Sequence, residues 1–268
     1  MRWIVAMLLL LAGPARAQPV DVWWPLYEGR AIISGTTSET RGDAVVQAFR
    51  RVLVKMSGDP SLLEDARVGP FDAMAAGMVE DFFYRDRMGD EPHHDEQGTR
   101  DRPFDFTAHF DQEKINATLT LLGRKPFLLP RPKLVIRITV EKDGHRFPMT
   151  ADAEDDEQQR EALLAAAERF GMRVVLPDST NIAPPSAGAF VLSGTLVWRP
   201  AEGGWAGRWH FQPGQPRAGT TTFELLNSFP GLPAGARPRD WTITGVSFDD
   251  AFRDAVGGSL ATLAGVAK

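Results

Sequence analysis

The clearest pattern of hydrophobic and polar positions lies between residues 41 and 57. Apolar side chains recur there at steps of one, three and four residues, the spacing of one helix face. They are Ala44, Val45, Ala48, Phe49, Val52, Leu53 and Met56. Thr40 and Asp43 have the spacing of a capping box, and Gly58 is a typical C-terminal stop. We therefore predict an amphipathic helix over 41–57. Its solvent face carries Gln47, Arg50, Arg51 and Lys55.

The second clear pattern is the strict alternation of residues 103–110. Phe104, Phe106, Ala108 and Phe110 alternate with Asp105, Thr107 and His109, which is the period of a strand with one buried face. Weaker patterns predict a strand at 30–34, brief helices at 61–66 and 71–79, a strand at 81–87 and a helix at 112–122. Together these segments predict a β-α-β-β-α unit.

A proline-rich segment follows this unit and marks a domain boundary. Three prolines fall within residues 124–132, and such stretches interrupt regular structure between domains. Beyond it, the patterns predict a strand at 134–140, a turn at Asp143 and Gly144, a helix from 154 to Gly171, strands at 174–176, 220–225 and 241–246, and a closing helix from Ser247.

The best hairpin of the chain lies in this second half. Phe190, Leu192, Leu196 and Trp198 share one face of its first strand, and Trp205, Trp209 and Phe211 share one face of its second. The fold class is therefore α+β, with two tandem units at 20–123 and 133–266, each a mixed sheet covered by helices.

The N-terminus has the pattern of a secretory signal peptide. Arg2 supplies the positive end, residues 3–12 form the apolar stretch, and Ala15 and Ala17 fit the cleavage site. Ten apolar residues are too few for a membrane span of about 20. We predict that residues 1–17 are a cleaved signal peptide and that the protein is soluble and periplasmic, with no membrane-spanning segment.

Composition narrows the function classes. The chain contains no cysteine, which excludes a lipoprotein anchor, disulfides and thiolate chemistry. Loss of Arg2 and Arg16 on cleavage changes the formal charge from −5 to −7. Because proteins that bind nucleic acid need clustered positive charge, we expect no nucleic-acid partner.

No catalytic, cofactor or metal motif emerges from the sequence. The cluster from His93 to Glu96 has metal-ligand residue types, but adjacent histidines in a loop point in different directions. The acidic pairs 155–156 and 249–250 lie in predicted first helical turns, where the helix dipole explains them. We therefore assign no catalytic, cofactor-binding or metal residue and expect no cofactor.

Exposed tryptophans are the remaining candidates for binding. Trp205 and Trp209 provide either a stacking platform for a sugar or partner or ordinary core side chains, and the alternation favours the core. Trp23 and Trp24 are neighbours, so both cannot face inward on a strand. These four residues are the candidate partner contacts.

Several stretches together resemble the proteobacterial family catalogued as domain of unknown function 2066. They are AFRRVLVKMSGDPSLL at 48–63, Phe83 to Arg85, FDQEKINATLTLLGRKPF at 110–127, RPKLVIRITVEKDG at 131–144, AAERFGMRVVLPD at 166–178 and the hairpin from 190 to 205. The second half is also similar to the N-terminal α/β domain of the Tol translocation protein TolB. The chain departs from the family at Gly29 and Arg30, which interrupt the first strand. The resemblance implies an exported envelope protein without established catalytic residues.

We therefore expect a non-enzymatic periplasmic accessory that binds another cell-envelope component, either a protein or an outer-membrane component, in assembly or transport. One alternative is a glycan or peptidoglycan binding module that uses exposed tryptophan. Another is an enzyme with an unrecognised carboxylate site, because carboxylates from distant segments leave no local motif.

Overall fold

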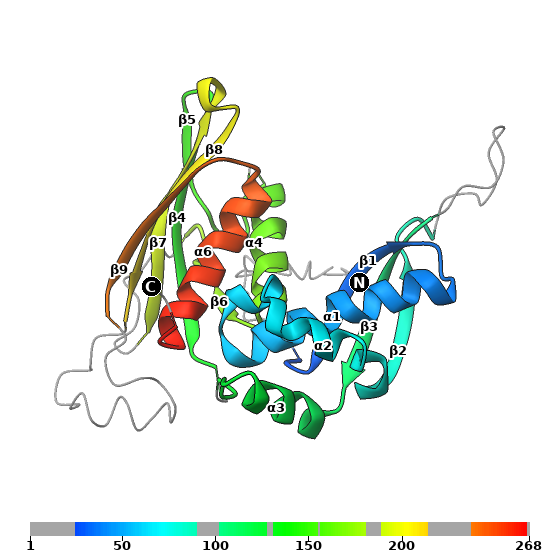
Figure 1. Ribbon diagram of the computed structural model, residues 1–268. Coiled ribbons are helices and arrows are strands. Elements are labelled where there is room, and N and C mark those ends of the chain that lie inside the picture. Colours follow the sequence, from blue (N-terminus) through cyan, green and yellow to red (C-terminus); the bar gives the residue numbers. More distant parts are fainter. Residues whose placement is uncertain are drawn as a thin grey trace, which may run out of the picture.

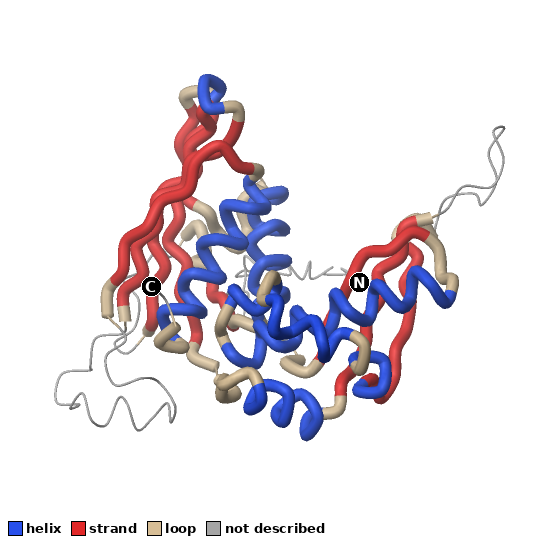
Figure 2. The backbone as a smooth tube through the Cα atoms, viewed as in Figure 1, coloured by secondary structure: helices blue, strands red, loops and turns tan. Residues whose placement is uncertain are grey.

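The computed structural model describes residues 25–89, 102–127, 131–154, 156–180, 189–213 and 237–266. Within these residues, two β-sheets lie at opposite sides of the molecule and most of the helices lie between them (Figures 1 and 2). The predicted α+β class is confirmed.

The first unit contains a three-stranded antiparallel sheet in the order β1-β3-β2. Its strands are β1 (Glu28–Ser34), β2 (Val79–Asp86) and β3 (Pro103–Phe110). Its helices are α1 (Ser38–Ser57), α2 (Gly69–Asp72) and α3 (Gln112–Leu121), with 3-10 turns at Pro60–Leu63, Ala66–Val68 and Ala75–Met78. The sheet is wholly antiparallel, whereas we expected a mixed one.

Helix α1 buries the predicted face against this sheet. Phe49, Val52 and Leu53 are fully buried, and Gly58 ends the helix in a left-handed conformation. The start was predicted too late, since Thr37 and not Thr40 is the N-cap and accepts a hydrogen bond from the backbone N–H of Thr40. The first turn is polar, so the apolar stripe gave no sign of it.

Close packing of α1 on β1 depends on Gly29. A Cβ atom at that position would lie 2.3 Å from the backbone oxygen of Ala48 on α1. Gly29 and Arg30 are regular members of β1, opposite Ala108 and Thr107 of β3. The expected interruption of the first strand is therefore absent, and glycine instead lets the helix backbone approach the strand.

The second unit contains a mixed sheet in the order β5-β4-β7-β8-β9, with β6 also paired to β4. Strand β4 is parallel to β6 and β7, and the other pairings are antiparallel. The strands are β4 (Lys133–Lys142), β5 (His145–Pro148), β6 (Arg173–Val175), β7 (Phe190–Arg199), β8 (Gly204–Gln212) and β9 (Arg239–Val246). The helices are α4 (Glu157–Phe170), α6 (Phe248–Leu263) and the 3-10 turn Pro200–Glu202.

The turn predicted at Asp143 and Gly144 joins β4 to β5. Both residues have positive φ angles, 51° and 80°, which is the conformation that a two-residue hairpin requires. Strand β5 was not predicted, because its four residues are too short to display a period. The strand expected at 220–225 lies outside the described residues.

Helices α4 and α6 pack side by side on the face of the large sheet that is directed at the first unit (Figure 1). The buried apolar side chains of both units form one continuous core. Phe127 and Arg131, from the predicted linker 124–132, are buried. The units are therefore packed against each other. Among the described residues, no helix is long and apolar enough to cross a membrane.

Candidate functional site

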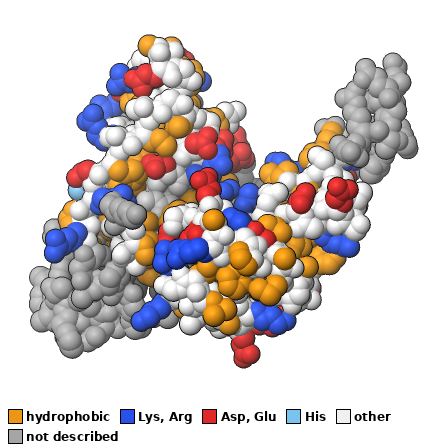
Figure 3. Space-filling view, in the orientation of Figure 1, with side chains coloured by type: hydrophobic (Ala, Val, Ile, Leu, Met, Phe, Trp, Pro, Cys, Tyr) orange, Lys and Arg blue, Asp and Glu red, His pale blue; other side chains and the backbone are white. Residues whose placement is uncertain are grey.

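A cleft of about 370 Å³ lies where the two units meet. Side chains of both charge signs gather in this part of the surface (Figure 3). The cleft is lined by β1, β2 and β3 of the small sheet and by helices α1, α4 and α6. Six of its lining residues are basic and three are acidic: Arg30, Arg51, Lys55, Arg85, Arg169 and Arg253, against Asp105, Glu168 and Asp249. In a chain with a net negative charge, this is a local excess of positive charge.

The small sheet contributes the face that α1 leaves free. Gly29, Ala31 and Ile33 alternate with Arg30 and Ile32 along β1, so the second set points away from the face that packs on α1. Alanines at positions 162, 165 and 166 of α4 line the opposite wall. Their small side chains leave the space between the two units open.

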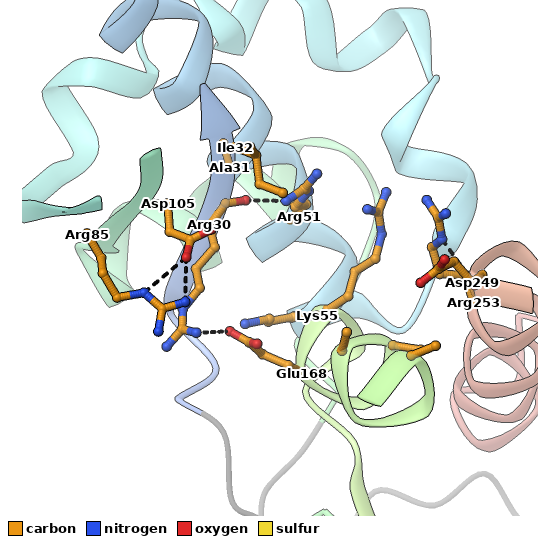
Figure 4. Close-up of a pocket in the computed structure, with 14 residues that line it drawn as sticks. Arg30, Ala31, Ile32, Arg51, Lys55, Arg85, Asp105, Glu168, Asp249 and Arg253 are labelled. Atoms are coloured by element: carbon orange, nitrogen blue, oxygen red, sulfur yellow. Dashed lines mark hydrogen bonds and ion pairs between the residues drawn. The ribbon is translucent and has the colours of Figure 1, made fainter. Parts of the chain in front are cut away.

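Two of the three acidic side chains of the cleft, Glu168 and Asp105, are paired with basic ones. Arg30 Nη1 lies 2.6 Å from Glu168 Oε1 and forms an ion pair between the two units. The angles of this contact are not those of a hydrogen bond. Arg30 Nε also donates to Glu28 Oε1 at 2.9 Å. Arg85 Nη2 lies 2.5 Å from Asp105 Oδ2 (Figure 4). Burial raises the pKa of Glu168, and the charges of Arg30 and Lys55 oppose that shift.

Lys55 is buried at the base of the cleft. Its ammonium donates to the backbone oxygen of Glu28 at 2.8 Å. Burial lowers the pKa of Lys55 to about 8, although Glu168 and Glu28 act in the opposite direction. The sequence placed Lys55 on the solvent face of the helix. That placement was wrong, because this side of α1 faces the second unit.

Three arginines from three helices complete the cleft. Arg51 comes from α1, Arg169 from α4 and Arg253 from α6. Arg51 donates to the backbone oxygen of Arg30 (Figure 4). Burial, together with the charges of Arg51 and Arg253, lowers the pKa of Arg169 to about 10. The three guanidinium groups are thus close enough to repel one another.

The predicted tryptophan contacts do not line this cleft. Trp205 and Trp209 are 5% and 0% exposed and lie in the core of the second unit, where Trp209 packs near Phe252. The alternation of apolar and polar residues along β8 accounts for this burial, and neither indole presents a surface for stacking. Trp23 and Trp24, the signal-peptide segment 1–17 and the cluster from His93 to Glu96 lie outside the described residues.

A serine, a histidine and an aspartate form one row across three strands of the large sheet. Ser193 lies opposite His210, and His210 opposite Asp240. His210 Nδ1 lies 2.8 Å from Asp240 Oδ1, but Ser193 Oγ donates to the backbone oxygen of His210 at 3.4 Å. A catalytic triad needs a hydrogen bond from the serine hydroxyl to the imidazole. The row is therefore a set of cross-strand contacts.

Sequence reasoning missed the cationic cleft. The only local signal is the i, i+4 spacing of Arg51 and Lys55, which places both on one face of α1. Arg169 and Arg253 come from helices more than a hundred residues away, and nothing in their local sequence distinguishes them from ordinary surface arginines.

Part of the chain is similar to a known protein family. Residues 23–125 match a family model described as Domain of unknown function (DUF8605). The predicted membership of the domain of unknown function 2066 family was therefore wrong, and no likeness to the TolB domain is found. The motifs that suggested it are an amphipathic helix and alternating strands, which unrelated α+β proteins share. No curated protein and no solved structure matches the chain.

Proposed function

We propose that this protein is a non-enzymatic accessory of the bacterial cell envelope, which binds an acidic group of another envelope component in the cleft between its two units. The observation that carries the proposal is the charge of the cleft, where six basic side chains meet three acidic ones. The predicted export signal supports a periplasmic location.

Binding is favoured over catalysis because two of the three acidic groups of the cleft are engaged. Glu168 is paired with Arg30, and Asp105 with Arg85. Among the described residues, no histidine lines the cleft. General acid-base catalysis needs a group that is free to exchange a proton with a substrate.

Glycan binding through tryptophan has less support. It requires exposed indoles, and Trp205 and Trp209 are buried. A charged cleft is better suited to an anionic group than to the flat apolar face of a sugar.

Site-specific photo-crosslinking in intact cells tests the proposal. Ile32 lines the cleft and is 56% exposed, so it accepts benzoylphenylalanine without loss of core packing. Leu121 on α3 is 75% exposed and does not line the cleft, which makes it the matched control. We expect a discrete adduct from position 32 that position 121 does not give and that Arg169→Gln weakens. No adduct at position 32, or the same adducts from both positions, would refute binding in the cleft.

A further inference from the structure

The cluster of Arg51, Arg169 and Arg253 is the most unusual feature of the cleft. The three side chains come from helices of both units, with Arg51 in the first and the other two in the second. Each is partly buried. The cluster therefore forms only because the two units pack together.

Little negative charge balances this cluster. Arg253 Nη2 lies 2.8 Å from Asp250 Oδ1, and Arg253 Nε donates to the backbone oxygen of Asp249 at 3.2 Å. In the part of the chain that the structure describes, no carboxylate oxygen lies within ion-pair distance of Arg51 or Arg169. Two of the three guanidinium groups thus lack an acidic partner among these residues.

Such an arrangement does not help the fold by itself. Burying a charge costs free energy unless an opposite charge or hydrogen bonds compensate. Burial is the main cause of the lowered pKa values of Arg51 and Arg169, and repulsion within the cluster adds to it. A bound anion would relieve both costs at once.

The geometry favours a phosphoryl group over a carboxylate. One arginine fork is enough for a planar carboxylate with a single charge. A phosphate monoester carries about −1.5 to −2 charges and three terminal oxygens arranged tetrahedrally. Guanidinium groups from three helices suit that shape and charge, and the remaining donors of Arg51, which also bonds the backbone oxygen of Arg30, and of Arg253, which pairs with Asp250, add to those of Arg169. The apolar side chains of Ala31, Ile32 and the alanines of α4 leave room beside it for the rest of a small ligand.

We propose that Arg51, Arg169 and Arg253 form a binding subsite for a phosphoryl group. The proposal rests on the proposed function of the cleft and specifies the acidic group that it takes. The group belongs either to a small phosphate ester or to a lipid headgroup, because the two share this chemistry. Since the cluster spans both units, the bound group would also hold them together.

Calorimetric titration of the purified full chain tests the subsite. The probes are inorganic phosphate and glycerol 3-phosphate, with acetate and succinate at equal ionic strength as carboxylate controls. We expect saturable binding of the phosphate probes only. Arg169→Gln should weaken it about tenfold, the worth of a hydrogen bond to a charged group. Arg67→Gln is the matched control, because Arg67 is exposed, pairs with Asp65 and does not line the cleft.

Two further measurements complete the test. Arg51→Gln, in the other unit, should weaken binding to a similar extent, and at equal concentration phosphate should raise the melting temperature of the parent more than that of either variant. Co-sedimentation with phosphatidylcholine vesicles that contain or lack phosphatidic acid identifies the source. If the protein binds the vesicles that contain phosphatidic acid and glycerol 3-phosphate displaces it, the ligand is a lipid headgroup. If it binds the soluble phosphate probes but not the vesicles, the ligand is a free phosphate ester.

Three results would overturn the subsite: no saturable binding of the phosphate probes, equal binding of acetate, or phosphate binding that is unchanged in both arginine variants. If the crosslink at position 32 persists in such a case, the cleft binds a different acidic group. If the crosslink is lost as well, the proposed function fails with it.

Discussion

Two sets of basic side chains lie at the junction of the units, and they differ in what their donors contact. Arg131 is 1% exposed, donates to the backbone oxygens of Lys55 and Phe170, and lies 4.9 Å from the ring centre of Phe127. Lys55 donates to the backbone oxygen of Glu28. Arg51 and Arg169 instead border the cleft. Arg131 joins the two units, and Lys55 joins α1 to β1 within the first unit. Arg51 also donates to the backbone oxygen of Arg30, but neither Arg51 nor Arg169 has a carboxylate partner among the described residues.

This difference shows that burial of a charge does not reveal its role. A buried cation has a structural role when it donates to carbonyl oxygens that have no other donor. Removing the cation leaves those oxygens buried and unpaired. A cation that is repelled by its neighbours contributes little to folding. Substitutions in the first set should therefore lower stability, whereas substitutions in the second set should weaken binding with little change in stability.

The largest expected effect is that of Arg131→Ala. It leaves the carbonyl oxygens of Lys55 and Phe170 without a donor and opens a cavity at the junction. We expect a loss of about 2 to 5 kcal/mol in the free energy of unfolding, measured by urea denaturation. Arg67→Ala, at an exposed arginine, should change it by less than about 0.5 kcal/mol. Equal midpoints for both variants would contradict a structural role for Arg131.

Lys55→Met should have the next largest effect, about 1 to 3 kcal/mol, because the carbonyl oxygen of Glu28 loses its donor. The sign of the pH dependence follows from the lowered pKa. Between about pH 8 and 10.5 the unfolded chain binds more protons at this lysine than the native protein does. The contribution of Lys55 to stability should therefore rise across that window and stay constant below it.

The measurement is the difference in unfolding free energy between the parent and Lys55→Met as a function of pH. Groups that titrate in both proteins cancel in this difference. A difference that stays flat from pH 8 to 10.5 would mean that Lys55 has an ordinary pKa and is not buried at the junction.

A smaller loss, about 1 kcal/mol or less, is expected for Arg30→Gln. This variant breaks the ion pairs with Glu168 and Glu28, but the Arg30 side chain is 41% exposed and water screens both pairs. Urea denaturation at low and high salt measures the effect, which should shrink as salt is added. A loss that does not change with salt would indicate that Arg30 acts through packing.

The smallest effect on stability should come from Arg169→Gln. Removing one of three repelling guanidinium groups should leave the unfolding free energy within about 1 kcal/mol of the parent, with any change toward greater stability. The same variant should bind phosphate about tenfold more weakly, so stability and affinity separate. A loss of 2 kcal/mol or more would place Arg169 with Arg131 among the structural cations.

The sequence predicted much of the local structure, because local structure follows from local periodicity. The buried stripe of α1, the alternation along β3 and the stops at Gly58 and Gly171 were all visible in the chain. The strands and helices around the predicted boundary also agree closely with the observed elements. Short segments such as β5 escaped, since four residues cannot display a period.

The candidate site was decided by tertiary structure alone. Polarity identified one side of α1 as its solvent face, yet Arg51 and Lys55 on that side meet a second unit whose position no local pattern encodes. Arg169 and Arg253 lie near them because α4 and α6 are placed between the large sheet and α1 (Figure 1). Periodicity along a chain determines which side chains share a face of an element. What that face meets depends on contacts between residues far apart in sequence, and those contacts created the cleft.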